Sequence, residues 1–304
     1  MKKILAVSAC LFLLLGSRAA YAGNSDFSLG TGYRSDKLDW NIAGDTTGHN
    51  PNVLSELKWE SLKIFEIKAG FRTDLNKRQY LLGSFGFGWI NDGTNQDSDY
   101  RGDNRTLEYS RSSNDADLGN VWDLSLGIGL NNNIRPNLSL NPVIGVSFHR
   151  QNLRIRNGFQ TVATSGTPPV GPFAYLNSKY DANWYGPWAG IDVKYAAESL
   201  VYTGGLELHL ARYLAEADWN LRTDLDHPKS FEHTALGGGV RANAGVRYAV
   251  TERLSLTGNA AYQRWMTMHG RDRTFFKNGT TADTRLNEVN WSSYDLSLGA
   301  GYSF

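Results

Sequence analysis

Residues 294–304, the last eleven residues of the chain, alternate between apolar and small or polar side chains up to the final residue. Successive side chains of a strand point to opposite faces, so the apolar members share one face. These members are Tyr294, Leu296, Leu298, Ala300, Tyr302 and Phe304. Both edges of such a strand need a partner, and in lipid every backbone N–H and C=O must find one. The pattern therefore predicts a closed barrel.

The alternation recurs in nine further segments, near 26–43, 53–73, 81–89, 122–130, 140–148, 189–195, 206–210, 240–250 and 254–262. A change of parity is expected in the first segment, before Leu38. Tight turns near Asn76, Asn133, Glu198 and Glu252 alternate with long polar connections, as in outer-membrane barrels. We predict an all-β fold: a single closed ten-stranded antiparallel transmembrane β-barrel with long extracellular loops and short periplasmic turns.

The connections at one end are expected to be loops at 44–52, 92–119, 160–171, 223–234 and 277–290, and the segment 92–119 is too hydrophilic to cross lipid. The residues expected to face inward mix both charge signs: Glu66, Lys68, Arg72, Asp123, Asp192, Lys194, Glu207, His209, Arg241 and Arg247. A ten-stranded barrel encloses little more space than an eight-stranded barrel, whose interior is filled by its own side chains. The interior is therefore predicted to be filled by its own ion pairs, which disfavours a wide pore. Aromatic residues near strand ends are interpreted first as membrane-interface anchors.

Residues 1–22 resemble a secretory signal, with a basic start, a short apolar run and a cleavage site at Ala20-Tyr21-Ala22. The barrel domain is then 23–304, located in the bacterial outer membrane with its loops at the cell surface. Cys10 is the only cysteine and lies in the apolar run, which excludes disulfides and thiol chemistry in the processed chain. The 32 Gly, 15 Tyr and 9 Trp suit a barrel, and the net charge of +1 argues against nucleic acid as a partner.

Two stretches carry a family resemblance. Asp26-Phe-Ser-Leu-Gly-Thr31 and Val53-Leu-Ser-Glu-Leu-Lys-Trp59 are similar to the first two strands of the omptins, and the order of strands and loops matches over nearly the whole processed chain. The omptins are ten-stranded outer-membrane proteases whose barrels project above the membrane. The resemblance implies a surface endopeptidase that cleaves polypeptides next to basic residues. It implies no cofactor and no metal. Lipopolysaccharide is considered as a possible requirement for activity.

The omptin resemblance also proposes four catalytic residues. Asp97 and Asp99 match an Asp-x-Asp pair, and Asp226 matches the aspartate of an Asp-x-His pair, although His227 comes one residue early. An aspartate-oriented histidine can act as a general base towards water, while the second carboxylate pair positions that water. If strand geometry persists at Asp226, its neighbour His227 points to the other face. A bulge or turn, which Pro228 favours, is then needed to bring the two side chains together.

Two omptin motifs are altered: one segment reads Ser110-Arg-Ser-Ser113, and the other reads Val146-Ser-Phe-His-Arg150. The second keeps only its arginine. Arg150 has the outward parity of Phe148 and lies just beyond the apolar band, where a cation can meet a lipopolysaccharide phosphate. The expected partners are thus outer-membrane lipid, lipopolysaccharide and a polypeptide substrate.

Two non-enzymatic alternatives remain open. Asp92, Asp97, Asp99 and Asp103 are also the residue type that ligates Ca²⁺. If the acidic loops bind only ions or a partner, the protein is a small porin-like channel or a structural or adhesive surface barrel. His149 and His209 are single strand histidines, interpreted as lumen-lining residues.

Overall fold

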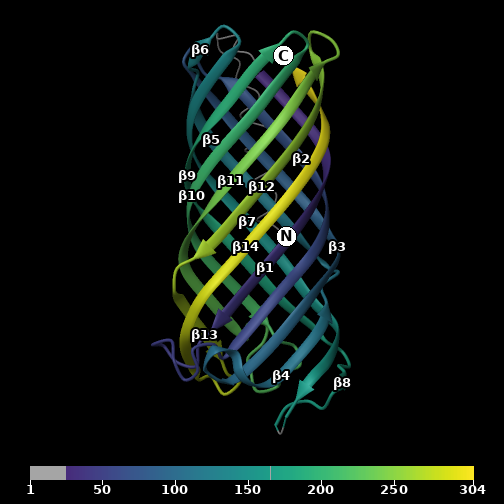
Figure 1. The fold of residues 1–304 in the computed structure, drawn as a ribbon, viewed down its shortest axis with the longest axis vertical. Coiled ribbons are helices and arrows are strands. Elements are labelled where there is room, and N and C mark those ends of the chain that lie inside the picture. The colour runs from purple at the N-terminus through teal and green to yellow at the C-terminus, as the bar shows by residue number, and fades with distance from the viewer. Residues whose placement is uncertain (1–24, 165) are drawn as a thin grey trace.

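The computed structural model describes residues 25–164 and 166–304, and almost all of them are extended (Figure 1). The predicted signal segment lies outside the described residues. The main strands are β1 Ser25–Ile42, β2 Ser55–Asp74, β3 Gln79–Gly102, β4 Thr106–Asp115, β5 Gly119–Leu130, β7 Leu138–Ala163, β9 Asn177–Ala197, β10 Leu200–Asp218, β11 Phe231–Ala249, β12 Leu254–Thr267, β13 Gly270–Phe275 and β14 Thr281–Ser303. Two short strands, β6 Asn133–Arg135 and β8 Gly171–Pro172, and one 3-10 turn at Asp103–Arg105 complete the elements. Within the described residues, no helix is long and apolar enough to span a membrane.

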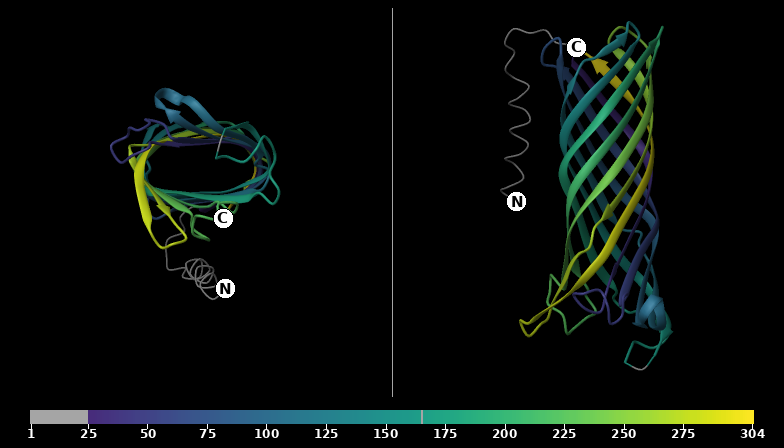
Figure 2. Two further views of the ribbon diagram at one scale, coloured as in Figure 1. Left: turned by 90° about the horizontal axis from the view of Figure 1, so that it is seen from below. Right: turned by 60° about the vertical axis from the view of Figure 1, so that its left-hand side comes forward.

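The strands form one antiparallel ring. The long strands pair with those next to them in the ring, and β1 pairs with β14 as well as with β2, so the ladder returns to its start. Two positions in the ring are each occupied by two strands. β4 and β5 both pair with β3 and β7, and β12 and β13 both pair with β11 and β14. Seen along its axis the ring is oval (Figure 2), and the predicted ten-stranded antiparallel barrel is confirmed.

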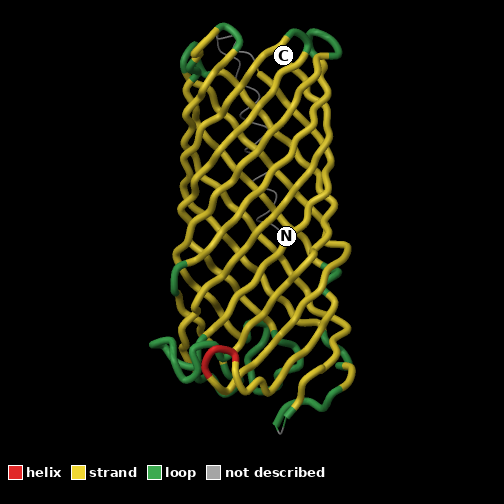
Figure 3. The backbone as a smooth tube through the Cα atoms, viewed as in Figure 1, coloured by secondary structure: helices red, strands yellow, loops and turns green. Residues whose placement is uncertain are grey.

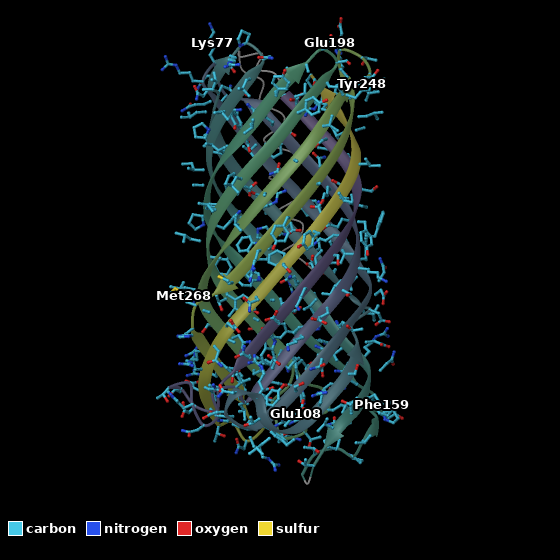
Figure 4. The ribbon with its side chains drawn as sticks, viewed as in Figure 1. Lys77, Glu108, Phe159, Glu198, Tyr248 and Met268 are labelled. Atoms are coloured by element: carbon cyan, nitrogen blue, oxygen red, sulfur yellow. The ribbon has the colours of Figure 1, made fainter. Side chains whose placement is uncertain are left out.

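The two ends of the barrel differ, as Figure 3 shows. Short connections at 75–78, 131–137, 198–199 and 250–253 lie at one end, where the predicted turns were placed. Lys77 and Glu198 mark this end in Figure 4, and Glu108 and Phe159 mark the other. Short turns are periplasmic in outer-membrane barrels, so the end that carries Glu108 is extracellular.

The outer wall carries the apolar half of each alternating strand. Leu298 of β14 is 75% exposed and Leu206 of β10 is 50% exposed, which is the arrangement of a lipid-facing band. Exposed aromatic rings flank this band near the periplasmic turns at Phe27, Phe71, Tyr195, Tyr202, Tyr248, Tyr302 and Phe304. A second set lies further along the strands at Tyr33, Phe65, Trp89, Trp122, Tyr185 and Tyr294. Such girdles sit at the two lipid–water interfaces.

The long polar segments are not loops throughout, which corrects the prediction. β3 continues to Gly102 and returns as β4, so most of 92–119 is a β-hairpin that extends the wall beyond the lipid. β7 likewise runs to Ala163, β11 begins at Phe231, and β14 begins at Thr281. A strand outside lipid needs no apolar outer face, so its sequence loses the alternation that identified the membrane part. The expected parity change in β1 is wrong, because Arg34, Asp36, Leu38 and Trp40 all face the lumen and the register with β14 is unbroken there. The register with β2 does shift between Asp36 and Leu38, but the extra residue lies in β2, next to Ser61.

Ion pairs fill the lumen at the level of the lipid. Arg34 is 2% exposed and binds both oxygens of Asp36 at 2.6 Å, Glu66 at 2.9 Å and Asp123 at 2.5 Å. Further pairs join Lys68 to Asp295, Arg241 to Glu207 and Arg247 to Asp26. The predicted interior of paired charges is confirmed, although Arg34, at its centre, was not among the residues expected to face inward.

An aromatic core closes the lumen on the extracellular side of these charges. Trp59, Trp184, Trp265 and Trp291 are each at most 1% exposed and belong to one buried cluster with Leu38, Ile64, Tyr180 and Tyr213. Trp265 lies flat over β11 because Gly239 has no side chain; a Cβ there would lie 2.4 Å from the Trp265 ring. The interpretation of aromatic residues as interface anchors is therefore wrong for these four tryptophans, whose strands place them inside.

Candidate functional site: an acidic pair at the barrel mouth

Two aspartates of β3 face the lumen near the extracellular end of the barrel. Asp97 is the cross-strand partner of Leu57, and Asp99 is the partner of Ser55. Directly opposed residues of antiparallel strands point to the same face, and Leu57 is part of the buried aromatic core. The two carboxyl groups therefore lie on the mouth side of that core, beyond the lipid-facing Trp89.

β4 adds hydroxyl groups to the same face, because Ser112 is the partner of Asp97 and Ser110 is the partner of Asp99. Burial raises the pKa of Asp99 above its ordinary value, whereas hydrogen bonds from Ser55 and Ser110 lower it. Hydroxyl donors stabilise the ionised carboxylate. Asp99 is therefore the member of the pair better prepared to carry the negative charge.

Asp97 is the member better prepared to hold a proton. Burial raises its pKa well above the ordinary range, and the nearby charge of Asp99 raises it further. Within the described residues, Oδ1 of Asp97 is buried and has no hydrogen-bond partner. Two neighbouring carboxyls that cannot both ionise share one proton, and such pairs cluster at functional sites.

The raised pKa of Asp97 predicts a pH-dependent stability. The folded protein holds the Asp97 proton more tightly than the unfolded chain, so this group destabilises the fold as pH rises above the ordinary aspartate pKa of about 3.9. Asp97→Asn should therefore raise the melting temperature at pH 8 by a few degrees, since about 1 kcal/mol corresponds to about 2–4 °C in a chain of this size. Thermal unfolding at pH 8 and pH 3 measures this, and an equal rise at both pH values would contradict it.

The β10–β11 loop faces the two aspartates across the mouth. Trp219 packs against the aromatic core and lowers the pKa of Asp97. The charge of Arg222 lowers the pKa of both aspartates. Tyr109 of β4 belongs to the same cluster, because Asp99 raises and Arg222 lowers its pKa, after the larger effect of burial, which raises it. The end of β3 that carries Asp97 and Asp99 thus lies near the start of the loop after β10, where Trp219 and Arg222 are found.

His227 lies elsewhere. Its Nδ1 is 2.7 Å from Oδ1 of Asp218, and the carboxylate of Asp226 accepts the backbone N–H of His227 at 2.9 Å. Asp218 ends β10 opposite Lys179, which alternates with the lumen-facing Tyr180 and points outward. The imidazole therefore contacts the outer face of the wall. The predicted orientation of His227 by the Asp226 side chain is replaced by Asp218, and the catalytic roles of Asp226 and His227 stay predictions.

A buried histidine that sequence reasoning passed over lies beneath the mouth. Nδ1 of His233 is 2.9 Å from the Tyr180 hydroxyl, which is 2.6 Å from the Tyr213 hydroxyl. Nε2 of His233 lies 3.2 Å from Asp272. All four side chains are buried, so this group braces the aromatic core and does not meet substrate. Its only sequence signal is His233 itself, which was assigned to a loop.

The acidic residues proposed for Ca²⁺ do not gather at one point. Asp92 binds Lys63 at 2.6 Å, and Asp103 accepts the backbone N–H of Asn52 at 2.8 Å. Among the described residues, no group of three or more His, Cys, Asp or Glu side chains is arranged to hold a metal ion.

Arg150 has the predicted outward orientation and is 41% exposed as a side chain, but Asp181 already binds it at 3.1 Å. Arg154 lies four residues further along β7 on the same face. It lines a surface pocket of about 440 Å³ with Asn120, Asn152 and Asn177. Lipid binding by Arg150 remains a prediction.

Arg150→Ala should weaken binding of lipopolysaccharide by roughly fivefold, since a basic residue near an anionic membrane surface contributes about 1 kcal/mol. Titration of the detergent-refolded barrel with lipopolysaccharide measures this. Arg156→Ala is the matched control, because Arg156 lies on the same face of β7 and is held by both oxygens of Asp117. Equal affinities for all three proteins would leave Arg150 an ordinary interfacial charge.

The closed ring, the lipid-facing band, its two aromatic girdles and the asymmetric connections define an outer-membrane β-barrel protein. The chain belongs to the Pom family of Protochlamydia outer membrane proteins, whose family model matches residues 28–304. No curated protein matches the chain.

Among solved structures, one barrel with a high similarity score supports the fold. The chain is similar to the outer membrane protease OmpT from Escherichia coli, with a TM-score of 0.76 at 15% identity over 95% of this chain and 100% of that one. The translocator domain of the autotransporter NalP from Neisseria meningitidis matches at a TM-score of 0.38 and 12% identity, over 99% of this chain and 95% of that one. OprG from Pseudomonas aeruginosa matches at 0.37 and 10%, over 93% and 96%. The likeness to OmpT confirms the omptin-like barrel architecture.

Proposed function

We propose that this protein is a cell-surface endopeptidase of omptin type in which Asp97 and Asp99 activate a water molecule. The observation that carries the proposal is the pair of lumen-facing carboxyls at the mouth, both with a raised pKa. Groups with such pKa values near a cleft are candidates for general acid–base work. The structural likeness to a protease, OmpT, supports the same activity.

In the proposed reaction the two carboxyls have opposite roles. Asp99, ionised beside the hydroxyl groups of Ser55 and Ser110, takes a proton from water as the water oxygen forms a bond to the carbonyl carbon of the peptide. Asp97, protonated, gives its proton to the amide nitrogen as the C–N bond breaks. The proton on Asp99 then passes to Asp97, which restores the pair.

The preferred substrates are expected to carry Arg or Lys beside the cleaved bond. An acidic site surrounded by low-dielectric protein focuses its field and concentrates cations. Asp97, Asp99 and Asp224 lie on this mouth or on the loop above it, together with the cations Arg222, which pairs with Asp224, and Arg101, which lies over the Tyr109 ring.

A panel of fluorogenic peptides containing Arg or Lys tests the proposal, offered to the refolded barrel with and without lipopolysaccharide. Asp99→Asn removes a charge and almost no volume, so a loss of about 10²–10⁴-fold would be the loss of general-base catalysis. Asp92→Asn is the matched control, because Asp92 lies on the same strand but pairs with the exposed Lys63 on the outer wall. The proposal fails if the wild type is inert in both conditions or if Asp99→Asn cleaves as fast as the wild type.

His227→Ala separates the two possible roles of His227. A loss of similar size would mean that His227 turns into the mouth and acts as the base that the omptin resemblance implies. Unchanged or faster cleavage would mean that its contact with Asp218 on the outer wall is its working position.

A non-enzymatic surface barrel is the second candidate, and the outward position of His227 is the observation that favours it. Within this candidate, a channel requires a continuous water path, and the aromatic core interrupts that path within the described residues. Reconstitution in a planar bilayer beside the peptide assay distinguishes the candidates. Cleavage without current supports the peptidase, steady current without cleavage supports a channel, and neither supports a structural or adhesive role.

A further inference from the structure

A chain of polar contacts joins two tyrosines to a histidine beneath the mouth. The hydroxyl groups of Tyr213 and Tyr180 are 2.6 Å apart, and the Tyr180 hydroxyl is 2.9 Å from Nδ1 of His233. Nε2 of His233 lies 3.2 Å from Asp272, whose other oxygen accepts the Thr284 hydroxyl at 2.9 Å. A neutral imidazole that carries its hydrogen on Nε2, towards the carboxylate, has Nδ1 free to accept a proton. The Tyr180 hydroxyl therefore has a base at hydrogen-bond distance.

Aromatic rings connect this chain to the mouth. Tyr180 stacks on Trp59 at 5.1 Å and on Trp40 at 5.9 Å between ring centroids. The Phe231 ring lies 5.8 Å from the Trp40 ring and 4.7 Å from the Trp219 ring. Trp219 is the first residue of the loop after β10, and it packs on the core while only partly buried. Because electron tunnelling weakens steeply only as the gap between donor and acceptor widens, rings in such contact exchange electrons readily.

Tyr180 is the ring on this path that can best hold an oxidised state. Removing an electron from a buried ring leaves a cation, which is costly in a low-dielectric interior. Tyr180 is 0% exposed, yet it avoids this cost if its proton moves over 2.9 Å to His233, which is within the reach of proton transfer. Trp40 and Trp59 differ, because their indole nitrogens have no hydrogen-bond partner in the described part of the chain. An oxidised state that starts on a tryptophan is thus expected to end on Tyr180.

We propose that Trp219, Trp40 and Tyr180 form an oxidation relay that carries a radical from the mouth to the interior. A one-electron oxidant of the carbonate-radical class takes one electron from Trp219 and is reduced. An electron from Tyr180 then refills Trp219 by way of Trp40, while the phenolic proton moves to Nδ1 of His233. The products are the reduced oxidant, a neutral phenoxyl radical on Tyr180 and an imidazolium at His233 that faces Asp272. One electron and one proton leave Tyr180, and the reactive indole radical does not persist at the mouth.

A photo-oxidant attached at the mouth tests the relay. With Cys10 replaced by Ser, Leu221→Cys introduces a single thiol two residues after Trp219, at a side chain that is 41% exposed. A ruthenium polypyridyl complex attached there becomes a one-electron oxidant when it is illuminated with a sacrificial electron acceptor. Tyr175→Phe is included in this parent protein, because the Tyr175 backbone contacts the neighbouring Asn220 and its ring is 92% exposed.

Freeze-quench electron paramagnetic resonance of the parent should show a tyrosyl radical after illumination. Its formation should be slower in barrels refolded in heavy water, because a proton moves with the electron. Tyr180→Phe keeps the ring but has no proton to release, so it should lose the tyrosyl signal. Mass spectrometry should then find more oxidised Trp219 than in the parent, since its electron is no longer replaced.

Two further variants separate the proton step from packing. His233→Gln keeps an acceptor near the Tyr180 hydroxyl but removes the base, so the tyrosyl signal should be lost although the ring is unchanged. Tyr109→Phe is the matched control, because Tyr109 lies at the mouth under Arg101 and outside the path. It should change neither the signal nor the oxidation of Trp219.

A tyrosyl signal of parent size in a folded Tyr180→Phe barrel would overturn the proposal, and so would equal oxidation of Trp219 in the two proteins. A signal that survives His233→Gln with the same heavy-water effect would overturn it as well. Folding of each variant is checked by its heat-modifiable mobility in gels. If Tyr180→Phe does not fold, Trp219→Phe decides, because it leaves the interior intact and should lower the tyrosyl yield. An unchanged yield in that variant contradicts the relay.

Discussion

Arg34→Ala is expected to lower the free energy of unfolding of the barrel by about 3–5 kcal/mol, the usual effect of removing one partner from a buried ion pair. Arg34 satisfies Asp36, Glu66 and Asp123 at once, and the side chains of Asp36 and Glu66 are fully buried. Without the guanidinium these carboxylates keep only Lys68 and hydrogen bonds to cover their charge. The uncompensated buried charge, and not the lost contact area, is the cause of the loss.

Urea unfolding of the barrel in lipid vesicles, followed by tryptophan fluorescence, measures this change. Lys37→Ala is the matched control from the same strand, because Lys37 pairs with Glu60 on the outer wall and both side chains are about half exposed. The control should change stability by at most about 1 kcal/mol. A similar loss in both variants would show that the lumen network contributes no more than a surface pair.

Replacing both Trp265 and Trp291 by Ala should open the lumen and raise the conductance of the barrel above that of the wild type. The two residues are cross-strand partners whose rings stack at 5.5 Å, and each is 1% exposed. Removing a buried aromatic side chain costs about 3–5 kcal/mol and leaves a cavity. Here the cavity adjoins charged side chains, so water should enter it.

Single-barrel recordings in planar bilayers measure the conductance. Trp122→Ala is the control, since that ring is 40% exposed on the lipid-facing side and is not part of the core. If the double variant is folded and conducts no more than the wild type, other side chains close the lumen.

The membrane part of the fold was predictable because lipid imposes a simple rule. A strand with lipid on one side must place an apolar residue at every second position, so segments such as 240–250 can be recognised as strands from the sequence. The same alternation predicted which charged residues point into the lumen. The aromatic core was not predictable in this way, because Trp265 and Trp291 also lie where interface anchors would be expected.

Asp97 and Asp99 were proposed from their match to the omptin Asp-x-Asp motif, and the structure places both residues on the lumen face of β3 near the mouth. Their catalytic roles stay predictions. The position of His227 depends on how the loop after Asp218 folds against β13, and local spacing carries no information about that contact. Arg222 was missed because a lone arginine in a loop has no pattern.

The internal core has a consequence for the height of the mouth above the cell. β3 has 24 residues, whereas a membrane-spanning strand needs about 9–11, so the tilted remainder projects roughly 30 Å past the lipid. A hollow tube of that length would be held by its wall alone. In this barrel the projecting part is packed inside with buried side chains, so its wall is also supported from within. The acidic mouth is thereby held at a distance from the membrane surface.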